Sequence, residues 1–261
     1  MKLSNTNLIL ILIIIVWAIL AVVFGIYDLQ ISIAVVNETS NWGNFGADYG
    51  EVPGYGLIAI ALATYLGGYI PNVKKQKILG GVGVIVGIIY LIIGLVSSDE
   101  TDTALGATLI FSLFFYVILT WNKDWKNFRK ISGLISVLAI LNPLLLVQLI
   151  KLFWGRVRFR DLSPSYVEFT PWFIPNGFTD NYSFPSGHAA MGWMFLPLVV
   201  LVKDKKWSDP VKIINYVLVF GWGIFVALSR VIVGAHYASD VLFSTFFAMM
   251  ITVIFYKKLY K

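Results

Sequence analysis

The sequence predicts an all-α protein, a polytopic bundle of about eight transmembrane helices. Hydrophobic residues make up 58% of the 261 residues and charged residues 13%, whereas soluble domains carry roughly 25% charged residues. The apolar residues gather in eight long blocks that contain no Asp, Glu, Lys, Arg or His. A helix needs about 20 apolar residues to cross the hydrocarbon core, so such blocks are typical of membrane spans.

The eight blocks differ in length. Four are long enough to span a bilayer unaided, namely residues 8–26, 78–96, 104–121 and 131–150. Four need flanking residues to reach spanning length, namely residues 55–70, 189–202, 213–228 and 241–256. Pro143 lies within the fifth block and predicts a kink there.

The first block, residues 8–26, could be a cleaved signal peptide or a retained span. Its apolar run exceeds the roughly 7 to 15 residues usual for a signal peptide, and no clear small-x-small cleavage site follows. We therefore expect a retained span. No internal repeat or long linker divides the chain, so we expect a single integral membrane domain over residues 1–261. The absence of Cys excludes disulfides and thiolate metal sites.

The basic residues are distributed unevenly between the two sides of this predicted topology. The side with both termini would hold 15 of the 20 Lys and Arg residues. These are Lys2, Lys74, Lys75, Lys77, Lys123, Lys126, Arg129, Lys130, Lys203, Lys205, Lys206, Lys212, Lys257, Lys258 and Lys261. By the positive-inside rule this side is cytoplasmic, so we expect both termini in the cytoplasm and the protein in the cell membrane.

The remaining five basic residues fall on the opposite, extracytoplasmic side. They are Lys151, Arg156, Arg158, Arg160 and Arg230. They could reach from helix ends to lipid headgroups, as Lys and Arg commonly do. Because they run against the positive-inside bias and share their segments with both histidines of the chain, we favour the interpretation that they serve a local anion.

Both histidines belong to a three-part pattern near the ends of predicted helices. The pattern is Lys151 with Arg158, then Pro185-Ser186-Gly187-His188, then Ser229-Arg230 followed by His236 and Asp240. An imidazole can exchange a proton or attack phosphorus near neutral pH. Two histidines without cysteine argue against a zinc site, and a magnesium site would need more acids near Asp240. We therefore expect neither a metal nor another cofactor.

This pattern resembles the signature of the type 2 phosphatidic acid phosphatase (PAP2) superfamily, in its integral membrane lipid phosphatase branch. The resemblance covers about residues 151–240 and implies a catalytic core over residues 131–256, formed by the last four spans. Gly155 and Arg156 fit an extended form of the first motif. Phe159 departs from the pattern, since the family usually has Pro there, and this departure puts the loop geometry in question more than the activity.

The chemistry assigns a role to each residue type. His236 can act as the nucleophile, and Asp240, four residues later on a helix, would share its face and hold the imidazole. His188 is the natural general acid and would later activate water. The remaining residues, Lys151, Arg158, Ser186, Gly187 and Arg230, would bind the phosphate, the Arg side chains as bidentate forks. The resemblance implies a phosphohistidine intermediate at His236.

Two predicted outer loops are rich in aromatic residues. Residues 159–184 carry Tyr166, Phe169, Trp172, Phe173, Phe178 and Tyr182, and residues 27–54 carry Trp42, Phe45 and Tyr49. Aromatic side chains at this depth are typical of an interfacial belt that anchors loops among headgroups. A lid or lateral gate for a lipid phosphate is the alternative, and the two roles are compatible.

The resemblance implies a membrane lipid phosphatase that hydrolyses a phosphomonoester or diphosphate of a lipid at the extracytoplasmic face. Candidate substrates are phosphatidic acid, phosphatidylglycerol phosphate and polyprenyl diphosphate. We expect the lipid phosphate and membrane lipids as partners, with no nucleic acid and no obligate protein partner. Two alternatives stay open: a lipid phosphotransferase that uses the same site, and a non-catalytic lipid-binding or transport protein.

Overall fold

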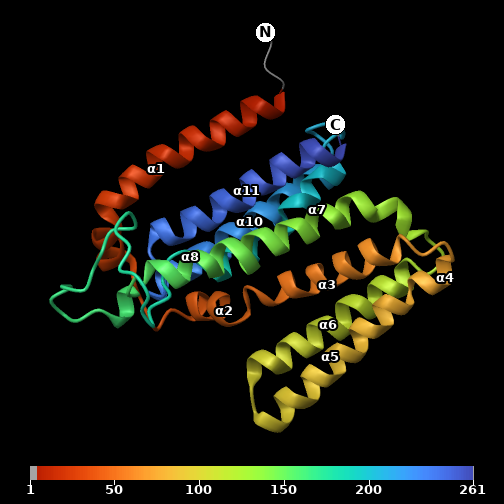
Figure 1. Cartoon of the computed structure of the whole chain (residues 1–261), viewed down its shortest axis with the longest axis horizontal. Helices are drawn as coiled ribbons and strands as arrows, with labels where there is room; N and C mark the ends of the chain where they lie inside the picture. The colour runs from red at the N-terminus through yellow and green to blue at the C-terminus, as the bar shows by residue number, and fades with distance from the viewer. Residues whose placement is uncertain (1–4, 261) are drawn as a thin grey trace.

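The computed structural model describes residues 5–260, and every regular element in that range is helical (Figure 1). Lys2 and Lys261 lie outside the described residues. The α-helices are α1 (Asn5–Val35), α2 (Asn41–Tyr49), α3 (Val52–Gly67), α4 (Val73–Gln76), α5 (Ile78–Ser97), α6 (Glu100–Leu119), α7 (Arg129–Ala139), α8 (Val147–Trp154), α9 (Gly187–Gly192), α10 (Pro210–Ile232) and α11 (Ala238–Tyr260). Short elements of other helical types are η1 (Trp125–Phe128), η2 (Ile140–Leu146), η3 (Phe159–Asp161) and η4 (Trp193–Val202).

The eight predicted blocks all coincide with helical segments of the structure. Blocks 55–70 and 104–121 run a few residues past the ends of α3 and α6. In the described range, six segments are long and apolar enough to cross a membrane. They are Thr6–Val35, Val73–Ser97, Glu100–Leu119, Trp125–Asp161, Pro210–Ile232 and Ala238–Tyr260, while Gly187–Val202 is apolar but shorter. The predicted all-helical class is confirmed, and the count of eight spans stays a prediction.

At Pro143, where the sequence predicts a kink, the structure has a π-helical segment inside one continuous helical run. Residues Ile140–Leu146 form η2 between α7 and α8. Proline cannot donate a backbone hydrogen bond, and a π-type turn is one way in which a helix accommodates this loss. The run therefore continues from the core to Lys151, at the end of the bundle where the first motif lies.

The sixth block is short, but its helix is stretched. After six residues of α9, the ten residues of η4 form a 3₁₀ helix that contains Pro197. A 3₁₀ helix rises about 2.0 Å per residue and an α-helix about 1.5 Å, so α9 and η4 together extend roughly 29 Å. That length is close to the hydrocarbon thickness of about 30 Å. The segment from Gly187 to Val202 can therefore cross most of a bilayer despite its 16 residues.

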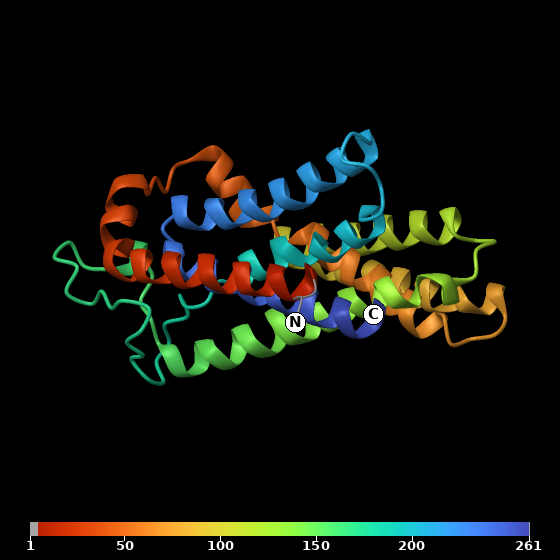
Figure 2. The ribbon, with the colours of Figure 1, turned by 90° about the horizontal axis from the view of Figure 1, so that it is seen from above.

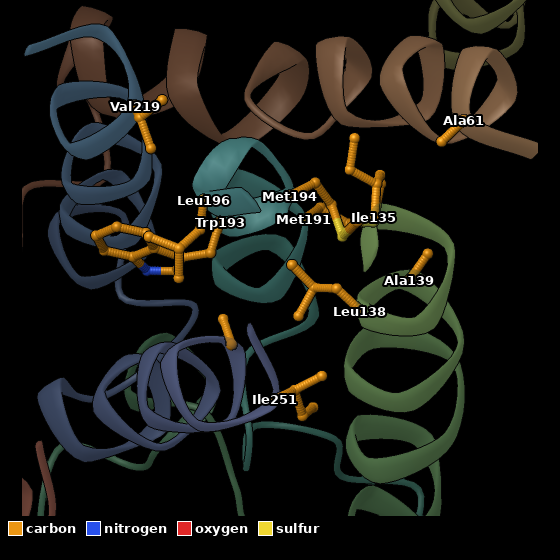
Figure 3. Packing of buried hydrophobic residues seen from close by; sticks show 11 residues of the cluster. Ala61, Ile135, Leu138, Ala139, Met191, Trp193, Met194, Leu196, Val219 and Ile251 are labelled. Carbon is orange, nitrogen blue, oxygen red and sulfur yellow. The ribbon is translucent and has the colours of Figure 1, made fainter. Parts of the chain in front are cut away.

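The main hydrophobic core surrounds this stretched helix. Trp193, Met194 and Leu196 of η4 are buried together with Ile135 and Leu138 of α7. Figure 3 shows these side chains pointing toward one another between α3, α10 and α11. The core thus fixes α9, whose first residues carry the second motif, against the helices that bear the first and third motifs.

The start of α1 and the end of α11 lie near each other in two perpendicular views (Figures 1 and 2), and Nζ of Lys257 donates to Oδ1 of Asn7 at 3.1 Å. The α5 and α6 helices form a hairpin at the side of the bundle. At the opposite end of α1 and α11, the long loop of residues 159–184 projects beside α2 and the end of α8. All three sequence motifs come together at this end.

Candidate active site

Backbone hydrogen bonds join the second and third motifs. The amide of Ser186 donates to the carbonyl of Asp240 at 3.1 Å, and the amide of His236 donates to the carbonyl of Arg230 at 3.1 Å. The hydroxyl of Ser244 also donates to the carbonyl of Ser186 at 2.6 Å. The turn between α10 and α11 is therefore fixed against the start of α9, and the two histidines lie on facing segments.

His236 is held by a backbone carbonyl. Its Nδ1 lies 2.6 Å from the carbonyl oxygen of Ser183, and its side chain is only 3% exposed. A carbonyl oxygen can only accept a hydrogen bond, so Nδ1 must carry the proton. The neutral ring consequently has its lone pair on Nε2, which is the atom that could attack phosphorus.

Asp240 lies on the same side of the chain as His236, as the four-residue spacing predicts, but at a longer distance. Its Oδ2 is 3.6 Å from Nδ1 of His236. The same oxygen accepts from the hydroxyl of Ser183 at 2.6 Å and from the amide of Tyr237 at 2.9 Å. Asp240 therefore acts on the imidazole electrostatically and fixes Ser183, whose carbonyl makes the direct contact.

Arg156 does not face an external anion. The interpretation that the five outer basic residues serve a local anion is therefore wrong for Arg156. Its guanidinium is fully buried and pairs with Asp240 at 2.6 Å and with Asp28 of α1 at 3.0 Å. It also donates to the hydroxyl of Ser239 at 2.8 Å and stacks over the ring of Tyr237. Two buried carboxylates need a cation, and Arg156 fills that role.

Three other basic side chains remain near the histidines. Lys151 interacts electrostatically with both Arg158 and Arg230, and its Nζ lies 3.7 Å from the position that a Cβ on Gly187 would take. Arg230 donates to the carbonyl of Ala47 at 3.2 Å. The Nε atoms of Arg158 and Arg230 are buried without a hydrogen-bond partner within the described residues. This concentration of positive charge suits an anion with several oxygens.

Arg160, the fifth outer basic residue, lies farther toward solvent. Its side chain is 36% exposed and is 3.9 Å from Asp161. Its amide donates to the carbonyl of Gly234 at 3.1 Å, which ties the first motif to the turn before His236. We therefore assign Arg160 to this loop contact and keep Lys151, Arg158 and Arg230 as the predicted phosphate ligands.

The second motif begins a helix. The hydroxyl of Ser186 accepts from the amide of Ala189 at 3.2 Å and so caps α9. His188 follows in the first turn, where its Nε2 lies 3.6 Å from Oε2 of Glu51. The predicted roles of Ser186 and Gly187 in phosphate binding stay predictions, because the Ser186 side chain already has this structural task.

Phe159, where the resemblance leads one to expect proline, follows a backbone conformation that is compatible with proline. Arg158 has φ −73° and ψ 152°, the extended conformation that a residue before proline adopts. The ring of Phe159 stacks on Tyr166 and meets Tyr237 edge-on. Tyr237 is next to His236, so Phe159 places an aromatic contact beside the site.

The aromatic loop is partly fastened to the bundle. The indole of Trp172 donates to the carbonyl of Ala21 in α1 at 2.8 Å, and Phe169 packs on Tyr237 with ring centroids 5.5 Å apart. By contrast, Phe173 and Phe178 are exposed. The exposed rings suit the predicted interfacial belt, whereas Trp172 and Phe169 pin the loop to the core near the site.

Four contributors to the site were missed in the sequence. Ser183 and Ser239 adjoin motif residues but carry no distinctive spacing. Asp28 follows the first apolar block, and an acid inside a membrane segment is itself a functional signal. Glu51 lies in a segment that the sequence presents as an aromatic loop. None of the four could be paired from sequence with its partner, because the contacts span 53 to 211 residues.

The α2 helix, also unforeseen, lies over the third motif. Gly46 of α2 approaches Ser229 so closely that an added Cβ would be 2.6 Å from the Cβ of Ser229. This absence of a side chain lets the next residue, Ala47, reach Arg230 with its carbonyl. The segment between α1 and α3 therefore forms one wall of the site.

Burial controls the charge of two groups outside the helices. It lowers the pKa of His236 to about 4, although Asp240 acts in the opposite direction. His236 is therefore neutral at physiological pH, the state that its predicted role as nucleophile requires. Burial also raises the pKa of Glu51, while Arg230 and Lys151 lower it. In the part of the chain that the structure describes, no three His, Asp or Glu side chains are grouped as a metal site requires.

A lateral apolar cavity of about 350 Å³ adjoins the site. It lies between α3 and the run formed by α7, η2 and α8. Glu51 and Gly187 line its polar end, and Ile58, Leu62 and Leu144 line its apolar part. A hydrocarbon chain can occupy such a cavity while the attached headgroup reaches the basic residues.

The comparison with family models decides the family. A model of the PAP2 superfamily matches residues 131–261, half of the chain. The chain belongs to the PAP2 superfamily. Its match begins in α7 and includes all three motifs, as the resemblance of the sequence predicted.

Curated relatives of this PAP2 protein are phosphatases. Lipid A 4'-phosphatase of Francisella tularensis subsp. novicida is 30% identical over 164 residues, 59% of this chain and 69% of the relative. Phosphatidylglycerophosphatase B of Haemophilus influenzae is 25% identical over 236 residues, 87% of this chain and 84% of the relative. Sphingosine-1-phosphate phosphatase 1 of Rattus norvegicus is 32% identical over 79 residues, 30% of this chain and 18% of the relative. No solved structure matches the chain significantly.

Family membership, the phosphatase relatives and the six membrane-length helices together define the class of protein. The PAP2 protein is an integral membrane phosphoric monoester hydrolase of the lipid phosphatase type.

Proposed function

We propose that this PAP2 protein hydrolyses a lipid phosphate through a phosphohistidine intermediate at His236, without a metal. The observation that carries the proposal is the 2.6 Å contact between Nδ1 of His236 and the carbonyl of Ser183. It supports a neutral ring with a free electron pair on Nε2, the state that a histidine nucleophile requires.

In the first step, Nε2 of His236 attacks phosphorus and the bond between phosphorus and the lipid oxygen breaks. His188 donates a proton to the departing alkoxide. Lys151, Arg158 and Arg230 bind the phosphoryl oxygens, on which negative charge is spread in the transition state. The carboxylate of Asp240, 3.6 Å from Nδ1, stabilises the positive charge that develops on the ring of His236.

In the second step, His188 has lost its proton and acts as a base. It removes a proton from water, and the resulting hydroxide attacks the phosphohistidine. The bond between phosphorus and Nε2 breaks, inorganic phosphate leaves, and His236 returns to its neutral form. His188 ends this step protonated and ready for another cycle.

The proposed substrate is a membrane lipid with a terminal phosphate. Support comes from the apolar cavity that ends at Glu51 and Gly187, and from relatives whose names specify lipid A, phosphatidylglycerophosphate and sphingosine 1-phosphate. Phosphatidic acid, phosphatidylglycerol phosphate and polyprenyl diphosphate remain the candidates to compare. We propose that residues 131–256 form the catalytic core of a single domain, 1–261.

We also propose that the site faces the extracytoplasmic side, with both termini in the cytoplasm. The distribution of Lys and Arg in the sequence supports this orientation. Labelling of single cysteines is a direct check, because the chain has no native Cys. A cysteine replacing exposed Val167 should react with an impermeant reagent in intact cells, whereas one replacing exposed Trp207 should react only after lysis.

The decisive experiment measures phosphate release from the candidate lipids by purified protein in detergent with a chelator present. We expect release by the native protein, loss of it in His236→Ala, and an acid-labile, base-stable phosphoenzyme that His236→Ala lacks. No release from any lipid would refute the function, and a requirement for added magnesium would refute the mechanism. Transfer of phosphate to added alcohols in place of water would instead identify a phosphotransferase.

A further inference from the structure

We propose that Glu51 faces the leaving group of the substrate and makes the enzyme select lipid monophosphates over lipid diphosphates. In a lipid monophosphate the leaving group is a lipid alcohol. We infer that the enzyme prefers, among monophosphates, those whose alcohol carries a hydroxyl or amino group near the phosphate. This inference rests on the proposed function, because it takes His188 as the general acid. It concerns the substrate class, which the catalytic motifs leave open.

The first step of the inference is the position of Glu51 beside the acid. Its Oε2 lies 3.6 Å from Nε2 of His188. A general acid must come within about 3 Å of the oxygen that it protonates. With Nε2 as the donating atom, the leaving oxygen therefore lies at most about 7 Å from Oε2 of Glu51, whichever lipid is bound.

The second step is the path of the lipid away from the site. Glu51 lines the polar end of the 350 Å³ apolar cavity together with Gly187. A lipid whose phosphorus is at His236 and whose chain enters this cavity has to pass the Glu51 carboxylate with the atoms next to its ester oxygen. The hydroxyl of Tyr55 donates to Oε1 of Glu51 at 3.5 Å, which leaves Oε2 on the side of His188.

The third step is charge. The leaving group of a lipid monophosphate is an alcohol, which is neutral once protonated. The leaving group of a lipid diphosphate is a phosphate monoester, which carries negative charge beside the Glu51 carboxylate. Like charges placed together in a partly buried site are strongly unfavourable, whereas a hydroxyl or ammonium group would donate a hydrogen bond to the same carboxylate.

The basic residues near Glu51 do not cancel its discrimination against lipid diphosphates. Lys151 and Arg230 are the cations that interact with Glu51, but they also bind the oxygens of the transferred phosphoryl group in the proposed mechanism. A second phosphate would have to share them. Burial raises the pKa of Glu51, and the two cations oppose this shift. The discrimination against diphosphates therefore operates wherever the Glu51 carboxylate is ionised and should strengthen as the pH rises.

The test compares kcat/KM for matched lipids with the native protein and with Glu51→Gln. The probes are a polyprenyl monophosphate, the diphosphate of the same alcohol, and a sphingoid-base phosphate with and without acylation of its amine. We expect the native protein to favour the monophosphate, and Glu51→Gln to shift the ratio toward the diphosphate by about tenfold or more. Acylation of the amine should lower kcat/KM in the native protein and have less effect in Glu51→Gln.

Two further variants separate specificity from folding. Glu51→Asp keeps the charge and should keep the preference for monophosphate, even if its overall activity falls. Glu38→Gln makes the same chemical change at an exposed position of the same outer segment and should leave every ratio unchanged. Thermal unfolding in detergent shows whether each variant is folded. If Glu51→Gln fails to fold, the inference is tested by the ratio of kcat/KM for monophosphate to that for diphosphate in Glu51→Asp, and loss of the preference there would refute it.

The outcomes distinguish this inference from the proposed function. If the native protein releases phosphate but the ratio of kcat/KM for monophosphate to that for diphosphate is the same in Glu51→Gln, the role of Glu51 is refuted. The proposed hydrolase function is then unaffected. A native preference for diphosphate would also refute it and would indicate that Lys151 and Arg230 bind the second phosphate. If no lipid is hydrolysed by the native protein, the proposed function itself fails.

Discussion

Nδ1 of His236 is 1 Å closer to the carbonyl oxygen of Ser183, at 2.6 Å, than to the carboxylate of Asp240, at 3.6 Å. The imidazole is thus oriented by a backbone group, and the carboxylate acts through Ser183 and through its charge. A backbone carbonyl cannot be removed by substitution or protonated in the physiological range. The proton on Nδ1 is therefore fixed by the fold of the 183–186 segment.

The first prediction concerns the protonation of His236. Its pKa is depressed, so the ring should stay neutral, with its proton on Nδ1, until the pH falls to about 4, well below the ordinary value of about 6.5. Nitrogen NMR of histidine-labelled protein can measure this directly, since His188→Asn leaves a single histidine. A midpoint near 6.5, or a proton on Nε2 at neutral pH, would contradict the arrangement.

The second prediction isolates the acid role of His188. Replacing His188 by Asn should lower kcat for a lipid phosphate by about 10² to 10⁴, the usual contribution of a general acid. An aryl phosphate with a good leaving group needs no proton, so its hydrolysis should fall far less. Equal losses for both substrates would show that His188 does not protonate the leaving group. His236→Ala should lose activity on both.

The third prediction concerns the buried ion cluster. Arg156→Met leaves Asp28 and Asp240 buried without their cation, which should lower the free energy of unfolding by about 3 to 5 kcal/mol. The double variant that also carries Asp28→Asn should recover part of this loss, because one buried charge is removed. Arg160→Met, at a half-exposed position, is the matched control and should change stability by less than about 0.5 kcal/mol. Thermal or denaturant unfolding in detergent measures all three.

The fourth prediction concerns the wall formed by α2. A Cβ on Gly46 would lie 2.6 Å from Ser229, so Gly46→Ala should displace Ala47 from Arg230. Displacing a positioning contact by about 1 Å can cost on the order of 100-fold in rate, and we expect kcat/KM to fall by this order. Gly221→Ala in α10 is the control, because no atom lies within 4 Å of its Cβ position. Activity in Gly46→Ala equal to that in Gly221→Ala would refute the role of α2.

The helices and the motifs were accessible to sequence reasoning because both are local patterns. Each long helix contains all or most of one predicted apolar block, because hydrophobicity over about 20 residues decides membrane insertion. The proximity of His236 and Asp240 was expected from a helix that contains both residues. In the structure α11 begins at Ala238, so His236 lies just before the helix, and the two side chains are nevertheless 3.6 Å apart. The sequence could not predict that the helix forms a π-helical segment at Pro143. A kink and a π-helical segment are both ways for a helix to accommodate the missing amide proton of proline.

The partners of the motif residues were decided only by the tertiary structure. Arg156 belongs to the same loop as Arg158 and carries the same charge, yet it neutralises Asp28, 128 residues away, while Arg158 stays available. His188 meets Glu51 across the bundle. The sequence alone therefore determined the membrane helices, the family and the residue types of the site. Which carboxylates, carbonyls and cations face one another depended on long-range packing, since burial forces polar groups to pair with whatever the fold places within reach.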